Sequence, residues 1–326
     1  FMKKFCLIVG IILSVNGLFG CSDANTQSLD IKRFEKDVVQ FNTFQKAAKD
    51  NFVNNYSKVI SLYIDNIYPD STKTTEEKLS DYAGSTSFKY FQKDVVEKFS
   101  DLSALEKTLA LEKQNFEVIL NLNFPEIVTA VIPYNQSIIL DTTTVIVGLN
   151  HYMGTDYQPY STFPNYIREF KIPEKIPYDI AEAFLKTKYP YTPHQNTLLE
   201  RMIYEGAIYL AVEKAVPSFK DNIYLCMSND KFEWCKNNED KIWNQILIDD
   251  NLYTTDEKII NGIIMPAPFS NPISQQTPGM VGRWLGKEIL AKYQLGHNFS
   301  IIDFLKNKQY NNSQNILIES EYNGQK

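Results

Sequence analysis

The sequence predicts an α/β (α+β) fold in which a small mixed sheet is flanked by many helices, with a helix-rich C-terminal half. Two observations favour this class. Short runs of β-branched residues, separated by proline and asparagine, are concentrated in residues 118–149. Apolar residues at helical spacing fill much of the chain before this segment and nearly all of it after residue 177. The hydrophobic content of 44% is typical of a folded globular chain.

The elements before the predicted sheet follow from residue spacing and capping signals. We expect a first strand in residues 30–39 and a helix in residues 43–67, where aromatic and aliphatic side chains recur at helical spacing. Further helices are expected at about 86–99 and 102–117. Asp101 is a suitable cap for the second of these, because its carboxylate can accept hydrogen bonds from the free backbone N–H groups of the first turn.

The predicted strands and the later helices complete the fold. Strands are expected at 118–122, 127–132, 137–140 and 143–149. A hairpin turn is expected at 134–136. Helices are expected at about 177–188, 196–214, 230–248, 255–262, 278–295 and 299–307. No internal repeat and no long linker separates these elements, so residues 30–326 are expected to form a single globular domain.

The N-terminal segment is typical of a bacterial lipoprotein. A short basic head precedes an apolar run over residues 5–19, a secretory-signal pattern that is too short for a membrane-spanning helix. The run ends in LFGC, which resembles a lipobox, although Phe19 replaces the small residue usual at its position. We therefore expect a lipoprotein signal peptide in 1–20, lipidation of Cys21 and a polar tether over 21–29. The alternative is an ordinary signal peptide followed by a chance cysteine.

Lipidation would attach the mature chain to a membrane. A diacylglyceryl group on the Cys21 thiol and an acyl chain such as palmitate on the new N-terminus would form a durable anchor, because a single acyl chain holds a protein only marginally. Ser22 rather than aspartate follows Cys21, and Asp23 stands alone rather than in an acidic run. We expect a lipid-anchored protein of the cell envelope that faces the periplasm.

Charge and missing motifs argue against several classes of protein. The formal net charge is −6, and it becomes −8 when Lys3 and Lys4 leave with the signal peptide. An acidic chain without a basic run argues against nucleic acid or anionic lipid as a partner. The sequence contains no HExxH, GxSxG, P-loop or GxGxxG motif, and no two of His151, His194 and His297 are four residues apart. We expect no cofactor, no bound metal and no enzyme activity.

Cys226 and Cys235 are the cysteines that remain after the signal peptide and the lipidated residue are set aside. A disulfide between them is allowed in an oxidising compartment. Two buried free thiols are the alternative. A metal site is the least favoured, since no histidine or second cysteine pair accompanies them.

Two of the predicted helices carry residues whose packing can be anticipated. Gly279, Gly282 and Gly286 fall on one helical face, and such a stripe lets another element approach the backbone closely. Glu205 lies in a mostly apolar helix, where burial of its carboxylate is costly without a partner. Arg201, one turn earlier, is the expected partner.

Several segments resemble the gliding-motility lipoprotein GldB family of the Bacteroidetes. They are 149–157 (LNHYMGTDY), 196–206 (NTLLERMIYEG), 233–239 (EWCKNNE), 242–243 (IW), 266–269 (PAPF) and 278–286 (PGMVGRWLG). Their order and spacing agree with the family, as does the lipoprotein start. The resemblance implies a membrane lipoprotein that is required for gliding and associated with the machinery that exports adhesins. The partners that it implies are envelope proteins of a gliding or secretion apparatus.

A fainter similarity is to the gluzincin metallopeptidases, in which one helix bears HExxH and the next supplies a glutamate ligand. In the best register, Asp179 and Ala183 stand at the two histidine positions, Ile180 at the catalytic glutamate and Glu205 at the third ligand. Zinc hydrolysis of that type is excluded in this register, because Ala183 cannot bind a metal and Ile180 cannot act as a base. The similarity implies a zincin-like pseudoenzyme in which Asp179 and Glu205 are relics of the site or structural partners.

The expected function is therefore non-enzymatic action in gliding motility and the associated protein export. Two alternatives stay open at this point. One is a metal-dependent hydrolase with a divergent zincin-like site. The other is a lipoprotein that binds a glycan or peptide through the aromatic stretch at 152–166, although such stretches more often pack as core or loop cover.

Overall fold

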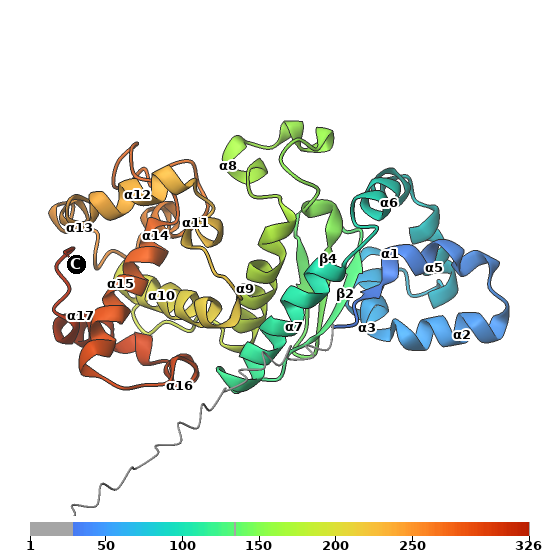
Figure 1. The fold of residues 1–326 in the computed structure, drawn as a ribbon, viewed down its shortest axis with the longest axis horizontal. Coiled ribbons are helices and arrows are strands. Elements are labelled where there is room, and N and C mark those ends of the chain that lie inside the picture. Colours follow the sequence, from blue (N-terminus) through green and yellow to red (C-terminus); the bar gives the residue numbers. More distant parts are fainter. Residues whose placement is uncertain (1–28, 134, 326) are drawn as a thin grey trace, which may run out of the picture.

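The computed structural model describes residues 29–133 and 135–325. The molecule is elongated, with the sheet near its middle, the N-terminal helices at one end and the C-terminal helices at the other (Figure 1). The predicted signal peptide in 1–20, Cys21 and the predicted tether up to residue 28 lie outside the described residues. The predicted fold class is confirmed, since a small mixed sheet is surrounded by many helices.

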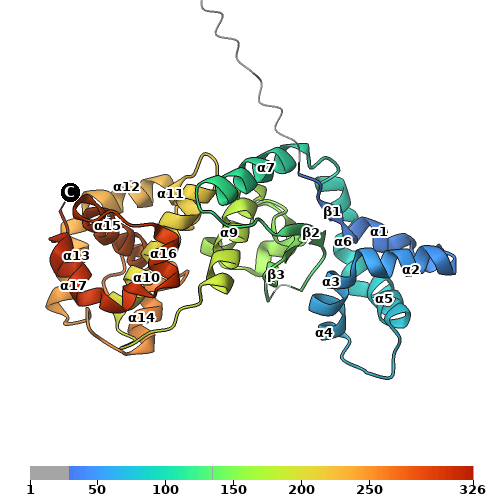
Figure 2. The same cartoon turned by 90° about the horizontal axis from the view of Figure 1, so that it is seen from below.

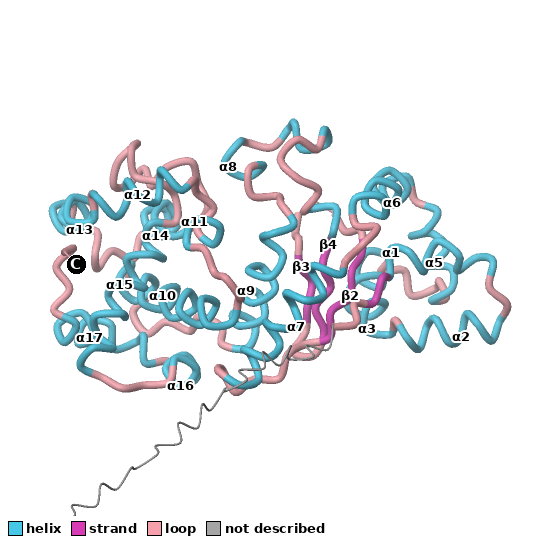
Figure 3. The backbone as a smooth tube through the Cα atoms, viewed as in Figure 1, coloured by secondary structure: helices cyan, strands magenta, loops and turns pink. Residues whose placement is uncertain are grey.

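The sheet has four strands in the order β1-β2-β4-β3. They are β1 (Lys32–Arg33), β2 (Glu126–Ala130), β3 (Ile138–Leu140) and β4 (Thr144–Gly148). β2 pairs in parallel with both β1 and β4, and β3 pairs antiparallel with β4. Every residue of β4 is buried, as expected for a central strand covered on both faces. Figure 3 shows the strands together in the middle of the molecule, with helices on both sides.

Two of the predicted strands are wrong over most of their length. Within residues 30–39, only Lys32–Arg33 is a strand, because the following side chains Phe34, Val38 and Phe41 are spaced as on a helix and are all buried. The strand predicted at 118–122 is a turn that closes a helix, in which the Leu122 N–H donates to the Phe116 carbonyl.

The hairpin in the sheet lies later in the chain than predicted. The turn predicted at 134–136 includes Tyr134, which lies outside the described residues, and β2 and β3 are not neighbours. The hairpin instead joins β3 to β4. Asp141 closes it, since its carboxylate accepts hydrogen bonds from the N–H groups of Thr143 and Thr144, each at 2.8 Å.

The helices before the sheet largely follow the predicted ranges. They are α1 (Phe34–Asp37), η1 (Val38–Thr43), α2 (Lys46–Asn55), α3 (Ser57–Val59), the π-helical η2 (Ile60–Ile64), α4 (Asp65–Ile67), α5 (Thr75–Gly84), α6 (Thr86–Lys98) and α7 (Ser103–Val118). The helix predicted at 43–67 is broken after α2, and α5 was not predicted. Asp101 does bind the first turn of α7, where its carboxylate accepts the Ser103 N–H at 2.8 Å.

The chain after the sheet is helical, as predicted for the residues after 177, whereas the short helices within 149–175 were not predicted. Its elements are η3 (Leu149–His151), η4 (Gln158–Thr162), α8 (Asn165–Arg168), η5 (Pro173–Lys175), α9 (Ile176–Lys188), α10 (Leu198–Ala215), α11 (Asp221–Tyr224), α12 (Asn229–Asn237), α13 (Glu239–Ile248), α14 (Glu257–Ile264), α15 (Val281–Gly296), α16 (Ile301–Lys306), η6 (Gln309–Asn312) and α17 (Ser313–Ser320). The helix predicted at 230–248 is divided into α12 and α13 at Asn238, and α17 was not predicted.

Helix α10 is buried on nearly all sides and crosses α15 at very short range. Figure 2, seen from below, shows the two helices side by side, as does Figure 1. A Cβ on Gly206 would lie 2.2 Å from the Gly286 carbonyl carbon, and a Cβ on Gly286 would lie 1.8 Å from the Met202 carbonyl oxygen. A Cβ on Gly282 would lie 2.7 Å from the Ile263 side chain of α14. Gly282 and Gly286 therefore serve helix packing, as predicted. Gly279 was predicted to share their helical face, but it precedes α15 and instead approaches the Ala267 backbone, 2.2 Å from where its Cβ would lie.

None of the helices within 29–133 and 135–325 is long and apolar enough to cross a bilayer.

Gly286→Ala should lower the free energy of unfolding by about 2–4 kcal/mol, because the new methyl group must push apart two helix backbones. Gly296→Ala is the matched control, since a Cβ at this position on the same helix meets nothing within 4 Å. Urea unfolding followed by circular dichroism measures both. Equal stability of the two variants would show that the α10–α15 crossing can relax.

Candidate functional site

Charged side chains from three helices meet where the sheet half of the molecule joins the C-terminal helices. α9 contributes Glu182 and Lys186, α10 contributes Arg201 and Glu205, and α15 contributes Arg283. We call these five residues the ionic cluster. Within each of the first two helices the members are four residues apart, so they lie on one helix face. The α10–α15 crossing brings the third helix to them.

The contacts within the ionic cluster are short. The Lys186 Nζ atom lies 2.7 Å from carboxylate oxygens of both Glu182 and Glu205. The Arg283 Nη1 atom lies 2.7 Å from Glu182 Oε1, and its Nε atom lies 3.6 Å from Glu205 Oε2. The predicted partner of Glu205 is confirmed, since Arg201 Nη2 lies 3.0 Å from Glu205 Oε1. Two carboxylates are thus shared among three cations.

The two carboxylates of the cluster are held ionised. Glu205 is fully buried, and burial on its own would raise its pKa, but the Lys186 ammonium and the Arg283 guanidinium hold that pKa below its usual range. Burial also opposes ionisation of Glu182, and Arg283 and Lys186 again lower its pKa overall. The same carboxylates raise the pKa of Arg283 against its burial. Each buried charge is therefore matched by an opposite charge.

Asp179 has contacts of its own rather than a place in the ionic cluster. The Tyr152 hydroxyl donates to its carboxylate at 2.8 Å, and the Lys175 ammonium lies 3.7 Å away. Burial raises the pKa of Asp179. On α9, Glu205 contacts Lys186, and it shares this lysine and Arg283 with Glu182. The predicted register instead places positions 179 and 183 of α9 opposite Glu205. Derivation of Asp179 and Glu205 from a zinc site stays a prediction.

Ammonium and guanidinium groups lie against both carboxylate oxygens of Glu205 and against Oε1 of Glu182. In the part of the chain that the structure describes, no three His, Cys, Asp or Glu side chains are grouped as metal ligands. The arrangement can fix the positions of three helices relative to one another.

Cys226 and Cys235 are separate free thiols in the structure, so the disulfide considered from the sequence is not formed there. Cys235 is buried, and burial raises its pKa to about 12. Burial also raises the pKa of Cys226. Both thiols are therefore kept in the protonated, unreactive form.

The segment that follows β4 is held by hydrogen bonds to the chain around it. The Asn150 amide pairs with both backbone groups of Ile132, at 3.0 and 2.8 Å, and the Tyr160 hydroxyl donates to the Asn150 carbonyl at 2.6 Å. Tyr152 and Tyr160 are buried in the core. These aromatic side chains thus pack inward rather than forming an open platform for a glycan.

His151 is buried in the same segment as a neutral ring. Its Nε2 atom lies 2.9 Å from the Pro133 carbonyl oxygen, and its Nδ1 atom lies 3.3 Å from the Lys171 ammonium nitrogen. Burial first, and then the positive charge of Lys171, lower the pKa of His151 to about 4. The histidine is therefore a structural group at neutral pH.

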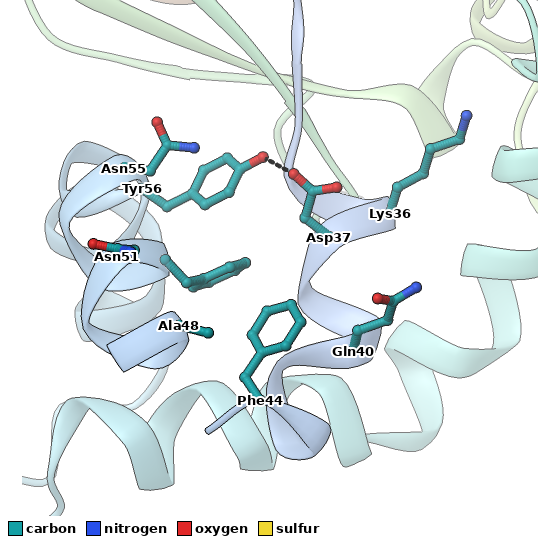
Figure 4. A pocket seen from close by; sticks show the side chains of 9 residues that line it. Lys36, Asp37, Gln40, Phe44, Ala48, Asn51, Asn55 and Tyr56 are labelled. Atoms are coloured by element: carbon teal, nitrogen blue, oxygen red, sulfur yellow. Dashed lines mark hydrogen bonds between the residues drawn. The ribbon is translucent and has the colours of Figure 1, made fainter. Parts of the chain in front are cut away.

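Two surface hollows lie away from the ionic cluster and from His151. One of about 540 Å³ lies between η1 and α2, with the Tyr56 hydroxyl donating to Asp37 across it (Figure 4). Phe44 and Phe52 form its apolar side, and the amides of Gln40, Asn51 and Asn55 are part of the remaining lining. A second hollow, of about 480 Å³, is mostly apolar and lies between α7 and the start of α9. Neither contains a member of the ionic cluster.

The comparison with protein families decides what the chain is related to. The family model described as gliding motility protein GldB matches residues 21–324. The chain belongs to the GldB family. No curated protein and no solved structure matches it. The matched range covers the ionic cluster, the buried segment after β4 and all described elements, so in this GldB family member they are parts of the matched region.

Sequence reasoning missed Glu182, Lys186 and Arg283. A local signal existed for the first two, which are an acidic and a basic residue four apart on a predicted helix. Arg283 lies between Gly282 and Trp284 on a face predicted to pack closely, and a cation there needs a buried partner. Which carboxylates it meets depends on the helix crossing.

Arg283→Met should lower the free energy of unfolding by about 3–5 kcal/mol, because it leaves buried carboxylates without their guanidinium partner. Adding Glu205→Gln to that variant should recover part of the loss, since one buried charge is removed. Lys73→Met, which breaks an exposed ion pair with Asp81, is the control and should change stability little. Chemical unfolding measures all three, and a mild effect of Arg283→Met would contradict the role of the ionic cluster.

Protonation of His151 should destabilise the fold. Its pKa is about 4 in the folded protein and ~6.5 in an unfolded chain, so the folded state binds fewer protons between these values. The free energy of unfolding that depends on neutral His151 is fully present above pH ~6.5. It is lost as the pH falls toward 4, and the loss is about 2 kcal/mol at pH ~5. His151→Gln should remove this part of the pH dependence. Unfolding curves at several pH values measure the slope, and an unchanged slope in the variant would exclude His151 as its source.

Proposed function

We propose that this protein is a membrane-anchored lipoprotein of the cell envelope that acts in gliding motility through protein contacts. The observation that carries the proposal is the match of the GldB family over residues 21–324. The matched range begins at Cys21, the residue that the sequence pattern predicts as the lipidated N-terminus of the mature protein. A lipid anchor at that position would leave every described element on one side of the membrane.

The contacts of the charged residues favour a non-enzymatic role. Glu182 and Glu205 are engaged by cations, Asp179 by Tyr152 and Lys175, and His151 by a carbonyl and a lysine. These groups hold helices and loops in place, and a catalytic acid or base would need a free approach to a substrate. Stoichiometric zinc in protein purified without added metal would contradict this part of the proposal.

The proposed partners are envelope proteins of the gliding and protein-export apparatus, and the proposed site is the periplasmic side of a membrane. This part rests on the family resemblance and on Ser22 and Asp23, which form neither an inner-membrane retention signal nor an acidic export run.

Deletion of the gene should abolish movement of single cells on glass, and the wild-type gene should restore it. Cys21→Ala should fail to restore movement, because the unanchored protein leaves the membrane. Cys226→Ala is the control, since this thiol lies outside the predicted anchor and should complement fully. Normal movement in the deletion strain would reject the motility role, and full rescue by Cys21→Ala would reject the anchor alone.

A further inference from the structure

The last turns of α7 carry an apolar patch that no described element covers. Val118 is 74% exposed, Ile119 53% and Leu111 41%. Val118 and Ile119 follow Leu111 by seven and eight residues, so the three lie on one side of the helix. Leu109 and Phe116 are buried on the opposite side. We call Leu111, Val118 and Ile119 the α7 patch. Single exposed aliphatic residues are ordinary on a protein surface, but three at one helix end call for a partner.

The described chain begins at the same edge of the sheet as the α7 patch. β1 and β2 are parallel, and the Lys32 ammonium lies 2.7 Å from the carboxylate of Glu126, the first residue of β2. α7 ends beside this point, because the Leu122 N–H donates to the Phe116 carbonyl and only three residues lie between Leu122 and Glu126. The four Cα-to-Cα steps span at most about 14 Å. Leu29, the first described residue, precedes Lys32 by three residues and therefore lies close to this edge of the sheet.

The length of the tether limits how far this edge can lie from a membrane. Residues 21–28 precede Leu29, and a fully extended chain covers at most ~3.6 Å per residue, which is roughly 28 Å in all. An acylated Cys21 therefore keeps the edge of the sheet that bears the α7 patch close to the lipid surface. A contact that would be too weak on its own becomes effective when the anchor supplies a high local concentration.

Two lysines line a hollow at the residues that directly follow the α7 patch in the chain, although the whole chain is acidic. Leu120 and Leu122 line a hollow of about 450 Å³ together with Lys188 and Lys306. Asp303 is the carboxylate in the same lining. Leu120 and Leu122 are buried, whereas Lys188 and Lys306 are exposed, so it is the two ammonium groups that could reach lipid phosphates beside the patch.

We propose that the α7 patch rests on the lipid surface that holds acylated Cys21, an inference that depends on the anchor in the proposed function. A protein partner suits the patch less well, since three partly exposed side chains offer far less than the ~800 Å² per partner of a stable interface. The docking orients the molecule. It turns the carboxyl ends of β2 and β4, with η4 and α8 beyond them, away from the membrane and toward envelope partners (Figure 1).

Quenching by brominated lipid tests this orientation in acylated full-length protein. The protein is reconstituted in vesicles of phosphatidylethanolamine and phosphatidylglycerol with brominated acyl chains. Ile119→Trp places a fluorophore in the α7 patch, and Ser161→Trp places a matched one on η4 at the opposite edge. The signal of the native tryptophans is subtracted with the parent protein. We expect the fluorescence added by the first substitution to be largely lost and that added by the second to be retained.

The other outcomes of the quenching experiment distinguish failure of the docking face from failure of the lipid anchor. Acylated, vesicle-bound protein in which the fluorophore of Ile119→Trp is not quenched, or in which both fluorophores are quenched alike, overturns the docking face and leaves the anchor intact. Protein whose mass shows no acyl chains overturns the anchor and the docking together. A concentration-dependent blue shift of the emission added by Ile119→Trp, in protein left unanchored by Cys21→Ala, would identify a second copy as the occupant. Circular dichroism of both tryptophan variants confirms that the fold is kept.

Discussion

The close crossing of α10 and α15 is the constraint on which the rest of the structure depends. Gly206 and Gly286 let the two backbones touch, and this contact holds the start of α15 against the buried side of α10. Arg283 is carried with it and meets Glu205 and Glu182. Since Glu182 belongs to α9, which packs against β3 and β4, one helix contact positions the C-terminal helices on the sheet.

The ionic cluster at this junction contributes more to the arrangement of the helices than to the free energy of unfolding. Burying ions costs solvation energy that their mutual attraction only partly repays, so hydrophobic side chains of similar volume would hold the helices at least as firmly. Charged groups, however, accept few arrangements, because each unpaired charge is costly. The three cations and two carboxylates therefore select one packing of α9, α10 and α15 among those that an apolar contact would allow. The proposed role through protein contacts would benefit from that selection.

Local signals explain which parts of the fold were predictable. α6 and α7 have caps and an apolar face within their own sequence, and both were located. α5 also carries a capping box, formed by Thr74 and Glu77, so the signal was present and was missed. The error at 118–122 has a different cause. Val118 and Ile119 favour a strand by their branching, yet they end a helix with their side chains exposed, and surface exposure of apolar groups cannot be inferred from local propensity.

The sequence by itself determined the fold class, the family, the predicted anchor at Cys21 and the need of Glu205 for a cation, because these depend on short motifs and on residues within one helical turn. Arg201 could be named as a partner for the same reason. Only the tertiary structure decided that Lys186 and Arg283 complete the ionic cluster and that Asp179 stays outside it. Helical spacing sets which side chains share a face, whereas charges on separate helices interact only at the distance that backbone packing allows.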